Sequence, residues 1–130
     1  MIDAPFQHIR VDHEGDAATV VVDRPDVHNA LSDQTIFELT NAFVRLGSDA
    51  AVRFVVLRGA GKHFSAGADL TYMRAIAHQG RDANVAGAYA LADMLAAIRD
   101  CPKPVVARVQ GACMGGGVGL VAACDIAVAA

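Results

Sequence analysis

Three consecutive glycines, Gly115–Gly117, are the first feature of the sequence that points to chemistry. A glycine run beside a helix costs conformational entropy, which favours a place where the backbone must approach something closely. The first N–H groups of a helix have no partner within it, and the helix dipole adds positive potential there. An oxygen atom that gains negative charge would therefore be stabilised at this run. The alternative is that the glycines only let a neighbouring strand or helix pack closely.

A second candidate is the loop Phe64–Asp69, which is rich in small residues and lies between a buried strand pattern and a short helical pattern. It is another place where backbone N–H groups can face a ligand, although it could also be an ordinary turn with Asp69 as the N-cap of a helix. Two such loops, each following an apolar strand, are more informative together. Two converging backbone donors would make an oxyanion hole.

The elements before these loops begin with a predicted hairpin. Two β-rich runs, Phe6–Asp12 and Ala18–Asp23, flank a turn signal at residues 14–16, and Pro25 stops the second run. Ser32 has the character of an N-cap. Apolar residues then recur at helical spacing, and Gly47 is a reasonable C-cap. The four residues on that helical face are Ile36, Leu39, Phe43 and Leu46.

The rest of the chain alternates between strands and helices. Arg53–Arg58 is an apolar run with charged ends, which is typical of a strand covered on both faces. A short helix is expected from Asp69, and a long amphipathic helix is marked by Ala88, Leu91, Leu95 and Ile98. Val105–Val109 and Ile126–Ala129 are further strands, separated by an apolar helix after the glycine run. This rhythm predicts the α/β class.

With 130 residues, 54% of them hydrophobic and 19% charged, the chain has the size and composition of one domain. That composition excludes a disordered chain, and a formal net charge of −3 argues against a nucleic-acid partner. No apolar stretch approaches the ~20 residues that span a bilayer, and the N-terminus lacks a secretion signal, so no membrane partner is expected. Three widely spaced cysteines indicate reduced thiols in a cytoplasmic protein.

Taken together, the motifs resemble those of the enoyl-CoA hydratase/isomerase (crotonase) superfamily over essentially the whole chain. The resemblance is carried by Arg24-Pro25, Asn29–Leu31, Phe64–Leu70, Pro102–Val105, Gly111–Gly117 and Cys124–Ala127. It implies an α/β fold of the crotonase-like ββα spiral type. Members are about twice as long, so residues 1–130 are expected to be the N-terminal portion of a single crotonase-like domain. The family assembles as trimers or dimers of trimers.

The resemblance also implies a site. The family stabilises the enolate of an acyl-CoA thioester with two peptide N–H groups, which fall here on Ala68 and Gly116. Coenzyme A is part of the substrate, and no separate cofactor or metal is expected. The segments that would lie along the acyl-CoA supply the implied binding residues Val27, His28, Ala30, Ser65, Ala66, Gly67, Asp69, Leu70 and Gly115.

One position departs from the family pattern. Well-known hydratases carry a glutamate two residues after the glycine run, where this chain has Gly119, and a second glutamate that would fall beyond Ala130. Hydration needs a group that activates water and one that protonates carbon. The chain therefore has the electrostatic half of a site without the proton-transfer half. Residues 1–130 alone are expected to be inactive.

Within the family, two segments are most similar to bacterial methylglutaconyl-CoA hydratases of branched-chain breakdown. These segments are 62–74 and 117–122. The resemblance implies hydration of a branched or carboxylated enoyl-CoA. The alternatives are an enoyl-CoA isomerase and a non-catalytic CoA-binding or oligomerisation member. A dinucleotide site at Gly117-x-Gly119-x-x-Ala122 is disfavoured, because residues 111–116 separate it from the preceding strand.

Several other polar residues can be explained by ordinary surface or structural roles. The five histidines show no metal-ligand spacing, and His63 is expected to be a solvated loop residue. Arg24, Lys62 and Arg74 could pair with CoA phosphates or could be ordinary surface charges. Cys113 has no partner base nearby in the sequence, so it is not assigned as a nucleophile. Asp125 is expected to have a structural hydrogen-bonding role.

Overall fold

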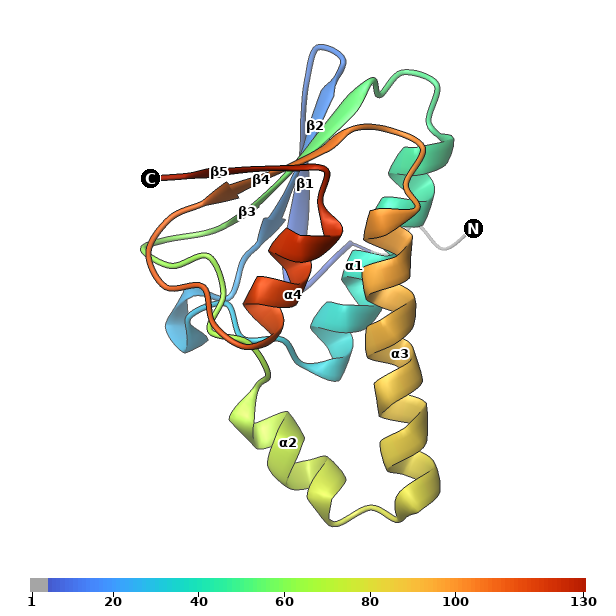
Figure 1. Ribbon diagram of the computed structural model, residues 1–130, viewed down its shortest axis with the longest axis vertical. Coiled ribbons are helices and arrows are strands. Elements are labelled where there is room, and N and C mark those ends of the chain that lie inside the picture. The colour runs from blue at the N-terminus through green and yellow to red at the C-terminus, as the bar shows by residue number, and fades with distance from the viewer. Residues whose placement is uncertain (1–4) are drawn as a thin grey trace.

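The computed structural model describes residues 5–130, which form one five-stranded sheet and the helices packed against it (Figure 1). The strands are β1 (Ile9–Glu14), β2 (Ala17–Val22), β3 (Phe54–Gly59), β4 (Val105–Val109) and β5 (Ile126–Ala129). They lie in chain order across the sheet. β1 and β2 are antiparallel, and the remaining pairs are parallel. The predicted α/β class is confirmed.

The hairpin that opens the chain is also confirmed, with its first strand shifted toward the turn. Ile9 pairs with Val22 and Glu14 with Ala17 around a turn in which Gly15 has a φ of 60°. The short 3-10 helix η1 (Pro25–Val27) follows β2 directly. Proline at this point cannot continue the ladder, so the chain leaves the sheet where the sequence predicts.

Helix α1 (Asp33–Ser48) begins at the predicted N-cap. The Ser32 hydroxyl accepts from the Thr35 N–H, and the Thr35 side chain accepts from the Ser32 N–H, which completes a capping box. The prediction that Gly47 ends the helix is wrong, because α1 continues through Ser48 and Asp49 is its C-cap. Gly47 instead makes room for Pro102, whose Cδ would lie 3.0 Å from a Cβ at this position.

Three further helices complete the fold: α2 (Leu70–Ala77), α3 (Arg81–Arg99) and α4 (Gly116–Ala123). Helices α1, α3 and α4 cover one face of the sheet, while α2 and the first half of α3 project beyond it (Figure 1). The core between the sheet and the helices is apolar, with Phe43, Leu57, Met94 and Leu120 all fully buried. None of the helices described is long and apolar enough to cross a membrane.

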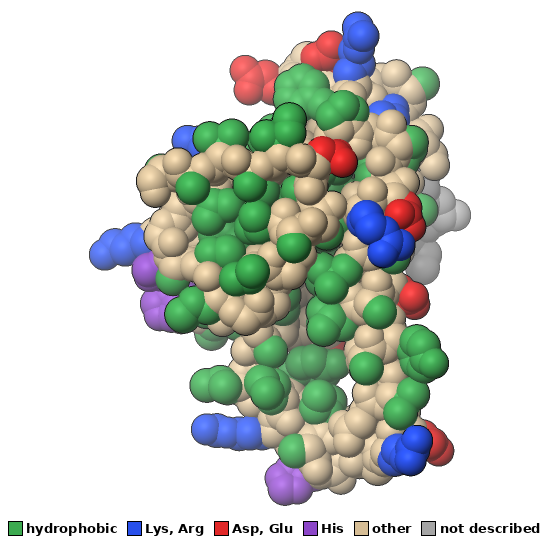
Figure 2. Space-filling model, in the orientation of Figure 1, with side chains coloured by type: hydrophobic (Ala, Val, Ile, Leu, Met, Phe, Trp, Pro, Cys, Tyr) green, Lys and Arg blue, Asp and Glu red, His purple; other side chains and the backbone are tan. Residues whose placement is uncertain are grey.

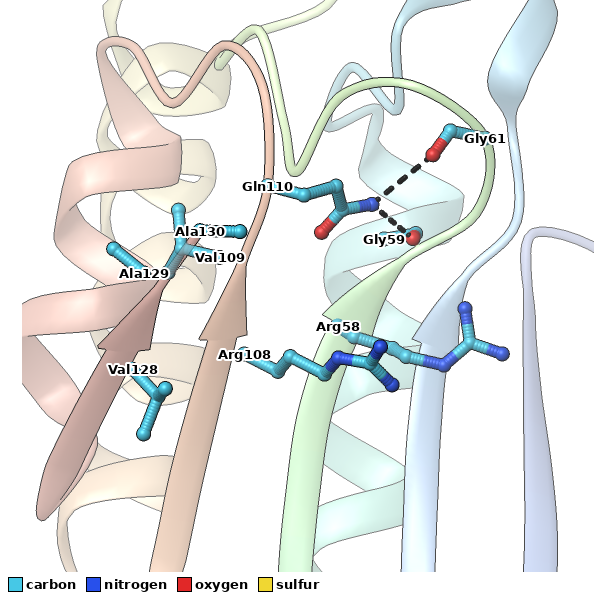
Figure 3. Close-up of a pocket in the computed structure, with 9 residues that line it drawn as sticks. All are labelled: Arg58, Gly59, Gly61, Arg108, Val109, Gln110, Val128, Ala129 and Ala130. Atoms are coloured by element: carbon cyan, nitrogen blue, oxygen red, sulfur yellow. Dashed lines mark hydrogen bonds between the residues drawn. The ribbon is translucent and has the colours of Figure 1, made fainter.

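Within residues 5–130, helices cover only one face of β3, whereas the sequence predicts a strand covered on both faces. Burial alternates along β3, and the side chains of Arg58, Arg108 and Val128 lie on the face away from the helices (Figure 3). The strand is apolar because one face meets the helices while valine and the stems of arginine occupy the other.

Candidate active site

Three connecting segments meet at the carboxyl ends of the parallel strands, the edge where ligands bind in open α/β sheets. Residues 28–32 follow β2, residues 60–69 follow β3, and residues 110–115 follow β4. Two isolated parallel bridges join them, Leu31 with Ala68 and Ser65 with Cys113. These bridges make the three segments a small second layer beyond the main sheet, and they fix the two loops predicted to carry donors.

The glycines at this junction are required by close approach. Gly67 has a φ of 92°, and a Cβ there would lie 2.8 Å from the Met114 carbonyl oxygen and 3.0 Å from the Gly116 nitrogen. A Cβ at Gly117 would lie 2.6 Å from the Ser65 carbonyl oxygen. The close-packing interpretation of the glycine run therefore holds at Gly117. The interpretation of the run as a place that stabilises a negatively charged oxygen stays a prediction.

The backbone N–H groups of Ala68 and Gly116 have no hydrogen-bond partner among residues 5–130. The bridge to Leu31 uses the atoms on either side of Ala68: Leu31 donates to the Gly67 carbonyl at 2.7 Å, and Asp69 donates to the Leu31 carbonyl at 2.9 Å. Gly116 is the first residue of α4, and its N–H precedes the helical ladder. Ala68 and Gly116 line the same cavity of about 320 Å³. These two residues thus border one space.

A buried asparagine positions the first segment. Asn29 is completely buried, with a φ of 56°, and its side-chain oxygen accepts from the Arg24 N–H at 2.9 Å. Its amide nitrogen donates to the carbonyls of Ala60 and His63, each at 2.8 Å. One side chain therefore joins the segments after β2 and β3. The residue type itself could have indicated a left-handed backbone at position 29, because asparagine is enriched at positive φ.

Arg24 and Asp69 form an ion pair below the loops. The Arg24 guanidinium donates to Asp69 at 3.0 Å and to the Ala30 carbonyl at 2.6 Å, and both side chains are largely buried. Asp69 also caps α2 by accepting from the Tyr72 N–H at 2.9 Å. That N–H and the Arg24 guanidinium lower the pKa of the Asp69 carboxyl. Arg24 is thus not a free surface charge, and a contact with a CoA phosphate stays a prediction.

The loops after β3 and β4 are also held together by side chains. The Gln110 amide donates to the carbonyls of Gly59 and Gly61, at 2.6 and 3.2 Å (Figure 3). His63 accepts from the Ala112 N–H at 2.9 Å through Nδ1. The expectation that His63 is a solvated loop residue is therefore wrong. It is half-buried, and its ring packs edge-on against His28 with the centroids 5.0 Å apart.

The residues implied to contact acyl-CoA fall into two groups. Val27, His28 and Leu70 are exposed around the loops, and Gly115 is exposed beside the two donors. A hollow of about 210 Å³ beside His28 is also lined by Lys62 and His63. Arg74 is exposed on α2.

The second group lies within the loop structure. Ser65, Gly67, Asp69 and Ala30 are buried, and Ala66 is half-buried. The Ser65 hydroxyl donates to the Asn29 carbonyl at 2.9 Å and accepts from the Gly67 N–H at 3.2 Å. These buried residues shape the loop that presents Ala68. Their contact with CoA stays a prediction.

Among the residues described, no carboxylate and no histidine lines the cavity. Gly119 lies on α4, where a Cβ would be 3.7 Å from Leu95. Glu38 has a structural role, because it is 2% exposed and its carboxylate accepts from the backbone N–H groups of Gln7, His8 and Ile9. Asp125 accepts from the Val105 N–H at 2.8 Å, which confirms its structural role.

The three cysteines are free, and the pKa values of two of them argue against nucleophilic chemistry. Burial raises the pKa of Cys113, while burial and the neighbouring Asp125 raise the pKa of Cys124 to about 12. Thiols with raised pKa values are poor nucleophiles at neutral pH. Within residues 5–130, no group of three or more histidine, cysteine or acidic side chains is arranged to hold a metal ion.

Comparison with known proteins agrees with this geometry. The family model described as enoyl-CoA hydratase/isomerase matches residues 12–130. The human mitochondrial Delta(3,5)-Delta(2,4)-dienoyl-CoA isomerase is 41% identical over 115 residues, covering 82% of this chain and 35% of the isomerase. The 4-chlorobenzoyl coenzyme A dehalogenase-1 of an Arthrobacter species is 40% identical over 125 residues, covering 93% of this chain and 44% of the dehalogenase.

The crystal structure of an enoyl-CoA hydratase from Shewanella pealeana superimposes with a TM-score of 0.93 at 35% identity. The match covers 95% of this chain and 47% of the Shewanella chain. The chain thus spans less than half the length of these relatives. The segment that matches the family model contains β2 to β5 and both predicted donor loops. The chain belongs to the enoyl-CoA hydratase/isomerase family.

Proposed function

We propose that this chain provides the oxyanion-stabilising and CoA-binding half of an enoyl-CoA hydratase. The observation that carries the proposal is the pair of unpartnered N–H groups, on Ala68 and Gly116, that line one cavity among the residues described. The acyl group is a branched or carboxylated one of the methylglutaconyl type, which is supported by the resemblance of residues 62–74 and 117–122. The enzyme works in the cytoplasm as a homotrimer or a dimer of trimers.

In this mechanism the thioester oxygen accepts from both N–H groups. Addition of water to the enoyl double bond places negative charge on that oxygen as the enolate forms. Donors that are already oriented stabilise this charge more than they stabilise the neutral thioester, and removing one such donor costs roughly 10²–10³-fold in kcat. Gly116 begins α4, so the helix dipole adds to the effect.

Proton transfer requires groups other than those described. The cavity side chains contributed by residues 5–130 include no carboxylate and no histidine. A carboxylate from another part of the protein, or the substrate's own carboxylate, would activate water and protonate carbon. For this reason residues 1–130 alone should not hydrate crotonyl-CoA, and measurable hydration by them would overturn this division of roles.

Isomerisation is the second candidate. It passes through the same enolate and needs only a proton shift, and the human relative that is 41% identical is named a dienoyl-CoA isomerase. A non-catalytic CoA-binding or oligomerisation role is the remaining alternative, kept open by Gly119 at the position of a family glutamate.

The test compares Gly116→Pro with Gly116→Ala in the full-length gene product. Both variants place a Cβ at about the same distance from Leu31, 3.2 Å for an ideal Cβ, but only proline removes the N–H. Proline is well tolerated at the first position of a helix. We expect Gly116→Pro to lower kcat for methylglutaconyl-CoA hydration by roughly 10²–10³-fold relative to Gly116→Ala. Equal activities would refute the role of this donor.

The choice of substrate separates the three candidates. Hydration of methylglutaconyl-CoA supports the hydratase, and turnover of a dienoyl-CoA without addition of water supports the isomerase. Tight binding of acyl-CoA with neither reaction supports the non-catalytic member.

A further inference from the structure

The cavity that contains the two donors ends at a wall shared with a second hollow. Tyr72 and Ile36 line the donor cavity of about 320 Å³ and also a hollow of about 240 Å³ between α1 and α3. Hydrophobic side chains border the space between α2 and the first half of α3 (Figure 2). Building on the proposed function, we propose that Tyr72 closes the far end of the acyl site and restricts it to short acyl groups.

Several contacts hold Tyr72 in this position. Its backbone N–H donates to Asp69 at 2.9 Å, so the residue sits in the first turn of α2, which is anchored through Asp69 to Arg24. The ring is half-buried and packs against the main core. A Cβ at Gly87 of α3 would lie 3.0 Å from the Tyr72 hydroxyl oxygen. Glycine weakens the interior of a helix, and here it makes the room that the tyrosine occupies.

The chemistry of the cavity restricts the acyl group further. Most of its wall is apolar, formed by Leu31, Ile36, Met73, Ile76, Ala88 and Leu91. The polar side chains among its described lining residues are Tyr72 and Asn84. This lining favours burial of the hydrocarbon part of an acyl group.

The hollow behind Tyr72 is the space that a longer chain would need. Apart from Ile36 and Tyr72, it is lined by Phe37 and Ala90, by the polar residues Thr40 and Asn41, and by the acidic residues Asp33 and Asp93. Removing the tyrosine ring would join this hollow to the donor cavity. The wall is therefore the feature that determines acyl length.

Binding of saturated acyl-CoAs, which cannot be hydrated, tests the wall directly. Isothermal titration calorimetry would measure Kd from butyryl- to dodecanoyl-CoA for the wild-type protein, Tyr72→Phe and Tyr72→Ala. Each methylene buried should tighten binding about fourfold. We expect this gain to stop at a short chain in the wild type and in Tyr72→Phe, which keeps the ring. In Tyr72→Ala the gain should continue to longer chains.

The outcomes distinguish the wall from the proposed function. The proposed role of Tyr72 would be wrong if affinity kept rising through the whole acyl series in the wild type. It would also be wrong if affinity stopped rising at the same acyl length in Tyr72→Ala as in the wild type. If Tyr72→Ala does not fold, Tyr72→Leu makes the same comparison with more apolar surface retained. If butyryl-CoA binds no more tightly than CoA itself, the proposed function fails instead.

Discussion

Replacement of Asp69 by alanine tests whether the site depends on one buried ion pair. The carboxylate accepts from the Tyr72 N–H at 2.9 Å and from Arg24 at 3.0 Å, with the two paired side chains 18% and 11% exposed. Loss of a helix N-cap costs about 0.5–2 kcal/mol, and breaking a buried pair by removing one partner costs about 3–5 kcal/mol. Because the two terms overlap, we expect a loss of about 3–5 kcal/mol.

Urea unfolding followed by circular dichroism measures this loss. A domain has a total stability of about 5–15 kcal/mol, so the change should be large in the unfolding midpoint. Asp69→Asn keeps a capping oxygen and should cost less than Asp69→Ala. In a double-mutant cycle with Arg24→Met, the double variant should be more stable than the two single losses predict, because the second substitution removes the unpaired charge.

A surface pair provides the matched control. Arg10 and Asp12 lie 3.1 Å apart with side chains 44% and 52% exposed, so Asp12→Ala should change stability by about 0.5 kcal/mol or less. If Asp69→Ala costs no more than Asp12→Ala, the buried pair does not hold the loops. The pKa of Asp69 is lowered in the folded state, so its contribution is complete above the ordinary carboxyl pKa and is lost as the pH falls through the lowered value.

Two further substitutions test other supports of the site. Glu38→Gln should lower the free energy of unfolding by about 2 kcal/mol, because the carboxylate accepts from three backbone N–H groups. Burial acts to raise the pKa of the Glu38 carboxyl, but hydrogen bonds from Gln34 and the backbone outweigh burial, and the pKa is lowered. Acid unfolding should therefore weaken the wild type more than Glu38→Gln, with Glu14→Gln as the exposed control, and identical acid profiles would contradict this role. Gly117→Ala should cost about 1–3 kcal/mol in urea unfolding, because its Cβ would lie 2.6 Å from the Ser65 carbonyl oxygen. Gly119→Ala, on the same helix with 3.7 Å of clearance, should be neutral or stabilising by up to about 1 kcal/mol, and an equal loss in both would refute the close-approach argument.

The order of elements was predictable because each leaves a local pattern. Helix α1 shows its N-cap and its three- and four-residue spacing in the sequence, and the end of β2 is marked by Pro25. The end of α1 was not predictable. Gly47 has the local character of a C-cap, but its role depends on Pro102, which lies 55 positions further along the chain and contacts it only in the folded state.

Candidate donors were also predictable, since glycine and small residues leave visible gaps in the sequence. The residues that orient those donors were not. Asn29, His63 and Gln110 act through carbonyl and N–H groups of other segments, over separations of 31 to 51 residues. A polar residue in a loop looks the same in a sequence whether it is solvated or bonded internally. For this reason the prediction that His63 is solvated is wrong.

The proposed site uses main-chain N–H groups as donors. Its activity should therefore depend less on the side chains of the donor residues than on the residues that orient them. Ala68 contributes no side-chain chemistry, so its replacement by another small residue should leave the donor in place. The direction of that donor is set by neighbours: the Leu31 bridge, the buried Asn29 and the Arg24–Asp69 pair. Substitutions at these supports should rotate the proposed donor without touching the substrate. Because oxyanion stabilisation depends on donors fixed before the reaction, such substitutions should lower kcat more than they weaken ground-state binding of acyl-CoA.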